Sequence, residues 1–222
     1  MFQSQTANSS PMPVEALIAE IDRADSAASL LAAVRTLADA RDPAAIPTLI
    51  RVLGFNNPGA AVAAVSGLVG IGKPAVVPLL EQLDSYNYGA RAWAIRALSE
   101  IRDPRALEIL VGAASDFALS VRRGAAKGLG SLHWTDLPEC DRPISQQKVL
   151  DTLLPTTRDP EWVVRYAAIV GLETLGSNLT AELSDRLETI ATCFESLERE
   201  DDELAVRARA SLARGRVTRL LQ

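Results

Sequence analysis

Arginine and aromatic side chains are concentrated in three short segments of this 222-residue chain. Arginine binds a carboxylate through two parallel hydrogen bonds, and tyrosine and tryptophan rings present faces that pack on flat conjugated groups. A carboxylate accepts hydrogen bonds from ring N–H groups. These residue types therefore suit a flat molecule that carries carboxylates. The candidate contacts are Tyr86, Tyr88, Arg91, Trp93, Arg122, Arg123, Trp162 and Arg165, with Asp84 and Asp116 as candidate acceptors.

The same residues also have structural interpretations. An arginine in a Val-Arg pair, such as Val121-Arg122, can bond an aspartate in the neighbouring turn. Asp84 and Asp116 stand just before expected helices, where an aspartate can cap the first backbone N–H groups. Trp93 can pack into a core. The sequence leaves both interpretations open for each residue.

No set of residues suits hydrolytic or metal chemistry. His133 is the only histidine, and Cys140 and Cys193 lack the Cys-x-x-Cys spacing of a zinc site. No glycine-rich phosphate loop is present. Cys193 is expected mid-helix and buried, whereas Cys140 is expected in a loop, where it could accept a ligand transiently. The chain is therefore expected to hold a ligand without a metal.

A helical repeat must position the candidate residues. It is marked by a leucine followed by an Asp-Pro or Lys-Pro pair, and the leucine and proline markers keep the same two spacings. Aspartate at the N-cap and proline at the first helical position both favour a helix start. The markers are Leu37 with Asp42-Pro43, Leu68 with Lys73-Pro74, and Leu98 with Asp103-Pro104. The repeat predicts an all-α superhelix, or solenoid, of helical pairs.

The expected organisation is a disordered tail over residues 1–13 and a single solenoid over 14–222 with about five to six repeats. Pro138 and Pro143 predict a loop insert near 134–147, followed by a returning helix from Lys148. The last helix, from about Glu203, is expected to depart from the repeat pattern, as a terminal capping element would.

Composition excludes several classes of function. The net charge is −5, with a pI near 5.0, whereas a nucleic-acid-binding protein usually carries a basic excess. No run of 18 apolar residues predicts a transmembrane helix, and the start lacks the pattern of a secretory signal. The two separated cysteines indicate a reducing compartment, so a cytoplasmic location is expected.

Two pairs of segments resemble known repeats. Val121-Arg122 with Ala125-Ala126 and Leu129-Gly130, and Val164-Arg165 with Ala167-Ala168 and Leu172, resemble HEAT-like repeats. The segments 84–98 and 116–123 resemble the F-type subunits of heterodimeric phycocyanobilin lyases. The resemblance covers about residues 28–212.

The resemblance implies a HEAT-like solenoid that pairs with a homologous E-type subunit. Such a pair attaches phycocyanobilin, an open-chain tetrapyrrole, through a thioether to a cysteine of the phycocyanin alpha chain. It implies that the candidate residues bind the bilin, which is a substrate, and that no cofactor is needed. Related F-type subunits that also isomerise the bilin carry a His-Cys pair before this helix. Residues 84–91 contain neither, so attachment without isomerisation is expected.

A second hypothesis concerns a protein without catalytic activity. The same repeats would suit a HEAT-repeat scaffold, adaptor or chaperone in phycobilisome assembly or turnover. Such a scaffold would bind protein clients but no bilin, so bilin binding separates the two hypotheses.

Overall fold

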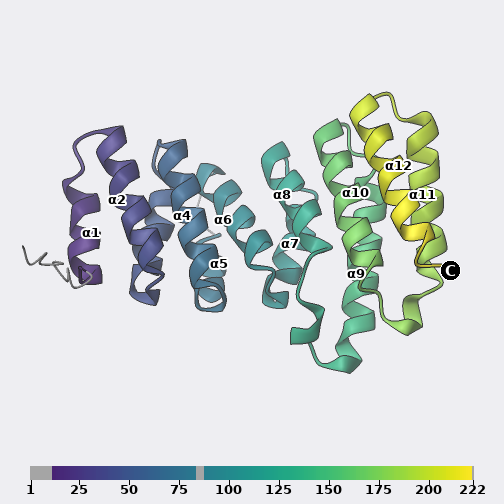
Figure 1. The fold of residues 1–222 in the computed structure, drawn as a ribbon, viewed down its shortest axis with the longest axis horizontal. Helices are drawn as coiled ribbons and strands as arrows, with labels where there is room; N and C mark the ends of the chain where they lie inside the picture. Colours follow the sequence, from purple (N-terminus) through teal and green to yellow (C-terminus); the bar gives the residue numbers. More distant parts are fainter. Residues whose placement is uncertain (1–11, 84–87, 222) are drawn as a thin grey trace, which may run out of the picture.

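The computed structural model describes residues 12–83 and 88–221. Over these residues the chain is a row of α-helices joined by short turns, without a strand (Figure 1). This architecture confirms the predicted all-α superhelix. Residues 1–11 of the predicted tail lie outside the described residues.

The helices alternate between two layers. After α1 (Val14–Arg23), the first helices of the repeats are α2 (Ala27–Ala40), α4 (Pro58–Ile71), α6 (Tyr88–Ile101), α8 (Leu119–Leu129), α10 (Trp162–Gly176) and α12 (Leu204–Thr218). The second helices are α3 (Ile46–Leu53), α5 (Val76–Gln82), α7 (Leu107–Ala113), α9 (Arg142–Thr156) and α11 (Arg186–Glu200). Each first helix packs against the next one, from α2 through to α12. Their starts therefore follow one edge of the molecule (Figure 1).

The repeat markers are core residues. Leu37, Leu68 and Leu98 are completely buried, and they belong to one apolar cluster that extends from Leu17 in α1 to Val217 in α12. Burial of each such leucine stabilises the fold by about 1.5–3 kcal/mol. The spacing seen in the sequence is thus the spacing at which successive pairs contribute to one continuous core.

The Asp-Pro pairs cap short 3₁₀ turns that lead into the second helices. The carboxylate of Asp42 accepts from the backbone N–H of Ala44 at 2.8 Å, and that of Asp103 accepts from Arg105 at 2.9 Å. Pro43 and Pro104 each open the turn that follows. Proline fits there because its missing N–H would have had no partner. The predicted capping role of both aspartates is confirmed.

The predicted insert is shorter than expected. Two 3₁₀ turns, Trp134–Asp136 and Glu139–Asp141, precede α9, which begins at Arg142. The prediction that the loop extends to residue 147 is therefore wrong. Pro143 lies in the first turn of α9, where proline starts a helix and does not interrupt it. Gln146, three residues later, is buried and joins α9 to the backbone of Asn178 and Thr180 through hydrogen bonds.

Helices α8 and α10 approach each other at glycines. A Cβ atom placed on Gly130, the residue after α8, would lie 2.5 Å from the carbonyl carbon of Gly171 in α10. A Cβ placed on Gly171 would lie 3.0 Å from a methyl carbon of Leu153 and closer to the carbonyl oxygen of Ala126. Only glycine permits this backbone contact, which sets the distance between the end of α8 and the second half of α10.

No single helix among the described residues is both long and apolar enough to cross a membrane. The helices over Pro58–Ile71 and Lys73–Gln82 are long and apolar enough only when taken together. The chain bends by 114° between them.

Candidate functional site

The starts of α8, α10 and α12 have the same turn. Asp116 accepts from the backbone N–H of Ala118 at 2.8 Å. Asp159 does the same for Glu161, and Asp201 for Glu203, both at 2.9 Å. A side-chain oxygen that satisfies the N–H two residues on stabilises a turn and caps the helix start. We call the residues 116–122, 159–165 and 201–207, together with Arg91, the helix-start edge.

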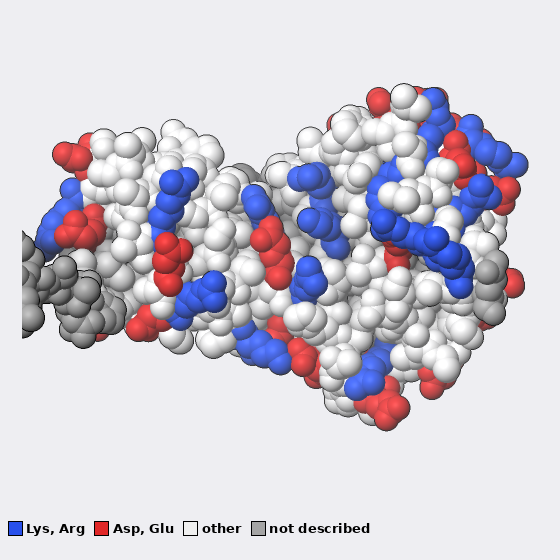
Figure 2. All heavy atoms as spheres, viewed as in Figure 1, with Lys and Arg blue, Asp and Glu red and all other residues white. Residues whose placement is uncertain are grey.

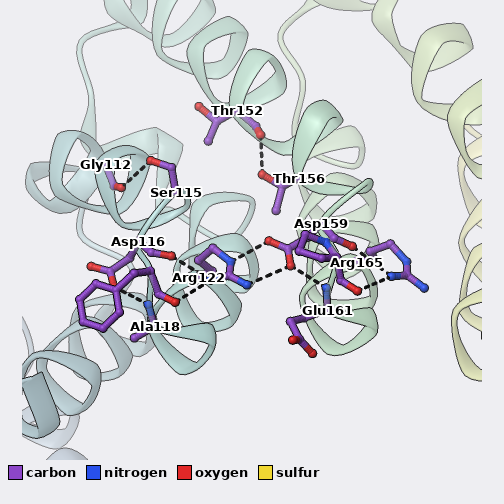
Figure 3. A network of polar contacts seen from close by, with 12 residues as sticks. Gly112, Ser115, Asp116, Ala118, Arg122, Thr152, Thr156, Asp159, Glu161 and Arg165 are labelled. Atoms are coloured by element: carbon purple, nitrogen blue, oxygen red, sulfur yellow. Dashed lines mark hydrogen bonds and ion pairs between the residues drawn. The ribbon is translucent and has the colours of Figure 1, made fainter.

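Arginines connect these turns across successive repeats. Arg91 forms an ion pair with Asp116 at 3.0 Å. Arg122 binds both carboxylate oxygens of Asp159, at 2.7 and 3.1 Å, and Arg165 binds both of Asp201, each at 2.8 Å. Figure 3 shows Arg122 reaching across to Asp159, with Arg165 beyond it. The structure therefore contains the Arg–Asp pairs of the structural interpretation.

The same arginines also hold their own turns. Nη1 of Arg122 donates to the carbonyl oxygens of Asp116 and Phe117, at 2.9 and 3.0 Å. Arg165 repeats this geometry with the carbonyls of Asp159 and Pro160. Each guanidinium therefore links two turns and fixes the spacing between adjacent first helices.

Helix α12 follows the repeat pattern at its start. Arg207 donates to the carbonyl oxygen of Asp201 at 2.7 Å, as Arg122 and Arg165 do in their turns. The expectation that the last helix departs from the pattern is therefore wrong at this end. The sequence contained the signal, because Val206-Arg207 repeats the Val-Arg pair and Asp201 stands six residues before the arginine.

The carboxylates of Asp159 and Asp201 are ionised at neutral pH. Burial of Asp159 opposes ionisation, but hydrogen bonds from Arg122 and from the backbone of Glu161 outweigh it and lower the pKa of this carboxyl. The pKa of Asp201 is lowered in the same way, against its burial, by Arg165 and the backbone of Glu203. Asp159 and Asp201 are therefore charged partners of Arg122 and Arg165.

Apolar side chains point to solvent beside these pairs. Phe117 is 72% exposed, Leu204 is 70% exposed and Trp162 is 40% exposed. Leu119, Trp162 and Leu204 occupy the same place in the three turns, three residues after the aspartate, and all are exposed. Adjacent repeats thus present a row of apolar groups, which is the kind of surface that binds a ligand or a partner.

The other candidate residues have different surroundings. Arg123 is exposed on α8 and makes no ion pair with any described residue. Trp93 is partly buried against the core, with the guanidinium of Arg96 5.7 Å from the centre of its ring. Asp116 is almost buried between Arg91 and the backbone of Ala118. Asp84, Tyr86 and the side chain of Tyr88 lie outside the described residues.

The remaining reactive groups are separate from this edge. Cys140 is exposed in the insert, whereas burial raises the pKa of the Cys193 thiol on α11. In the described ranges, no group of three or more His, Cys, Asp or Glu side chains could hold a metal ion. The exposed groups here are the apolar row of the edge and, next to it on α8, Arg123.

Comparison with known proteins places this architecture in a family. A model of HEAT repeats matches residues 14–87 and 76–173. The phycobilisome maturation protein of Synechococcus elongatus is 54% identical over 203 residues, which are 90% of this chain and 96% of that protein. The phycocyanobilin lyase subunit beta of a Nostoc species is 51% identical over 198 residues, covering 89% and 96% of the two chains.

A solved structure agrees with these relatives. One chain of the complex of CpcE and CpcF of phycocyanin lyase from Nostoc is 53% identical to this chain, with a TM-score of 0.72. The match covers 78% of this chain and 99% of that one. The chain therefore belongs to the HEAT-repeat family of phycocyanobilin lyase beta subunits.

Proposed function

We propose that this chain is the F-type subunit of a heterodimeric lyase that attaches phycocyanobilin to a cysteine of the phycocyanin alpha chain. The observation that carries the proposal is the likeness, at 53% identity, to a chain in the solved complex of CpcE and CpcF. The partner is a homologous E-type subunit. The bilin is the substrate, and the reaction takes place in the cytoplasm, where the two free cysteines of this chain would stay reduced.

The reaction requires few chemical groups from this chain. The client's thiolate adds to the ethylidene group on the first ring of the bilin and forms a thioether, so that no group leaves and no oxidant is needed. The lyase holds the bilin extended, orients it and keeps water and competing adducts away. Residues 84–91 contain neither His nor Cys, and this supports attachment without isomerisation.

Within this proposal the candidate residues divide by their surroundings. Arg123 and Trp162 are exposed, so we assign them direct contact with the bilin, and partly buried Trp93 contributes its accessible face. Arg91, Arg122 and Arg165 already bind aspartates, so they act chiefly by positioning the turns that carry the exposed groups. Asp116 caps α8 and binds Arg91. Asp84, Tyr86 and Tyr88 remain proposed contacts.

Reconstitution tests the function. The chain is produced with an E-type subunit, phycocyanobilin and the apo alpha chain of phycocyanin, and the client is then denatured and inspected for bound colour. We expect a fluorescent client whose colour survives denaturation because the bond is covalent. Equal colour without this chain would refute the proposal, and client binding without any colour would favour the scaffold hypothesis.

A single substitution tests the exposed aromatic contact. Trp162→Ala should slow bilin attachment about tenfold, because a large aromatic face is worth on the order of 1 kcal/mol beyond its apolar area. Its matched control is Phe55→Ala, since Phe55 is similarly exposed at 37% but follows α3, outside the helix-start edge. Initial rates and thermal unfolding would be measured for both. Equal rates for the two variants would remove Trp162 from the site.

A further inference from the structure

An unbalanced group of charges lies between α10 and α12. Arg209 Nη2 donates to one carboxylate oxygen of Glu173, and Arg216 Nη1 donates to the other at 2.8 Å. Glu173 is buried and Arg209 is only 9% exposed. One carboxylate therefore serves two guanidinium groups, and the group carries a net positive charge. We call Tyr166, Glu173, Arg209 and Arg216 the α10–α12 cluster.

One donor in this cluster lacks an acceptor. Nη1 of Arg209 is buried without a hydrogen-bond partner among the described residues. Burial lowers the pKa of Arg209, and the nearby charge of Arg216 acts in the same direction. A buried donor left unpaired costs about 1–3 kcal/mol, and more when it is charged. The positive charge of Arg209 is therefore only partly compensated within the chain, by Glu173.

Aromatic and apolar side chains lie next to these charges. Tyr166 is close enough to Arg209 for the two groups to interact electrostatically, and it stands two helical turns before Glu173 on the same face of α10. Trp162 lies one turn earlier, and both aromatic rings are partly exposed. Figure 2 shows basic side chains running together over α10 and α12, with little acidic surface between them.

We propose that the α10–α12 cluster binds a carboxylate carried by a flat conjugated molecule, and that this group is a propionate of the bilin. The second part rests on the proposed function. A ligand can reach the cluster at Arg216, because the side chain of Arg216 is 55% exposed and only its Nη1 atom donates to Glu173. A propionate would use its free donors and bring the net charge of the cluster to zero. The rings would then lie toward Tyr166 and Trp162.

The charge count selects the class of ligand. Two arginines and one glutamate leave a single positive charge, which one carboxylate neutralises. A phosphate dianion would leave an excess negative charge beside buried Glu173, which costs free energy in a poorly solvated site. The aromatic rings provide contact area for the apolar body of a ligand, and they would not stabilise a small inorganic anion. The cluster thus favours a monocarboxylate arm on a conjugated ligand.

Titration of the full chain with phycocyanobilin and with its dimethyl ester tests this site. Bilin absorbance reports binding, and the ester removes only the carboxylate charges. The wild type should bind the free acid about tenfold more tightly than the ester, as expected for one charge-assisted hydrogen bond pair. Arg216→Ala should lose most of that preference while its affinity for the ester stays the same. Arg216→Lys should restore part of it.

Arg214→Ala is the matched control. Arg214 lies on the same helix and is also partly exposed, but it pairs with Glu198 of α11 at 2.8 Å. Its loss removes the same charge from α12 without touching the cluster, so the acid-to-ester preference should remain. Helical circular dichroism of each variant shows that the fold is retained.

The outcomes separate this site from the proposed function. An unchanged acid-to-ester preference in Arg216→Ala overturns the site, as does a wild type that binds neither form of the bilin. Ligation that continues in reconstitution would leave the proposed function standing in both cases. Conversely, binding of the acid that depends on Arg216, with no ligation by the heterodimer, overturns the function and supports the site.

Discussion

Gly130→Ala should destabilise the chain by at least about 3 kcal/mol, because the new methyl group would meet backbone and not a movable side chain. The added Cβ would overlap the carbonyl oxygen of Gly171 and lie 2.5 Å from its carbonyl carbon and 2.7 Å from its Cα. No rotamer change relieves such a contact. Helices α8 and α10 would have to separate, and the shared core would open between them. Urea unfolding followed by circular dichroism measures the loss.

Gly215→Ala is the control for this substitution. Gly215 lies inside α12, and a Cβ placed on it has no atom within 4 Å. Alanine favours a helix over glycine by about 1 kcal/mol, so this variant should be slightly more stable than the wild type. The two glycine-to-alanine changes should therefore shift the urea midpoint in opposite directions. Equal midpoints would show that α8 and α10 do not meet as closely as the structure indicates.

Gly130→Ala should also disturb the helix-start edge. The approach of Gly130 to Gly171 sets the separation of α8 and α10 at the end of α8, and the Arg122–Asp159 pair joins the start of α8 to the turn before α10. Helices held further apart would lengthen this bridge. Reconstituted ligation should then fall together with stability in Gly130→Ala and remain at the wild-type level in Gly215→Ala.

The local part of the fold could be predicted from the sequence because its signals are local. Asp42-Pro43 and Asp103-Pro104 bring the cap and the first helical residue together within two positions. The buried leucines recur with the same spacing as these caps. Pro143 misled the prediction, because proline opens a helix as readily as it ends one, and the tertiary contacts that bury Gln146 in α9 are not visible in the local sequence.

The site could be predicted only in part, because its partners are remote in the sequence. Arg122 and Asp159 are 37 residues apart, and Arg165 and Asp201 are 36 apart. Residue types alone allowed each arginine to bind either a ligand or a neighbouring turn, and the stacking of repeats determines which aspartate it meets. Glu173 and Arg209 gave no signal, since each resembles an ordinary charged residue of an exposed helix face until α10 and α12 pack together.

Asp159→Ala should destabilise the chain by about 3 kcal/mol, because it removes one partner of a largely buried ion pair. Asp159 binds Arg122 through both oxygens and caps α10 through the backbone N–H of Glu161. Its loss leaves the Arg122 guanidinium, which is mostly buried, without a counter-charge. Asp159→Asn should lose less stability, because its amide oxygen can still accept the hydrogen bond from the backbone N–H of Glu161. Urea unfolding at pH 7 measures both variants.

Asp202→Ala is the control for charge alone. Asp202 is exposed and its carboxylate makes no ion pair with any described residue, so its removal should change stability by less than about 0.5 kcal/mol. A double-mutant cycle with Arg122→Ala then isolates the pair. A coupling free energy near zero between Arg122 and Asp159 would contradict the bridging role of this arginine.

The stabilisation by Asp159 should also depend on pH in one direction. The folded state lowers the pKa of this carboxyl below its unfolded value of about 3.9, so the folded chain resists protonation. Its contribution is therefore complete above about pH 5 and is lost as the pH falls through 4 and below. The gap in stability between wild type and Asp159→Ala should narrow over that range. A gap that stayed constant down to pH 3 would mean that the carboxylate does not carry the effect, and that loss of Asp159 acts through packing alone.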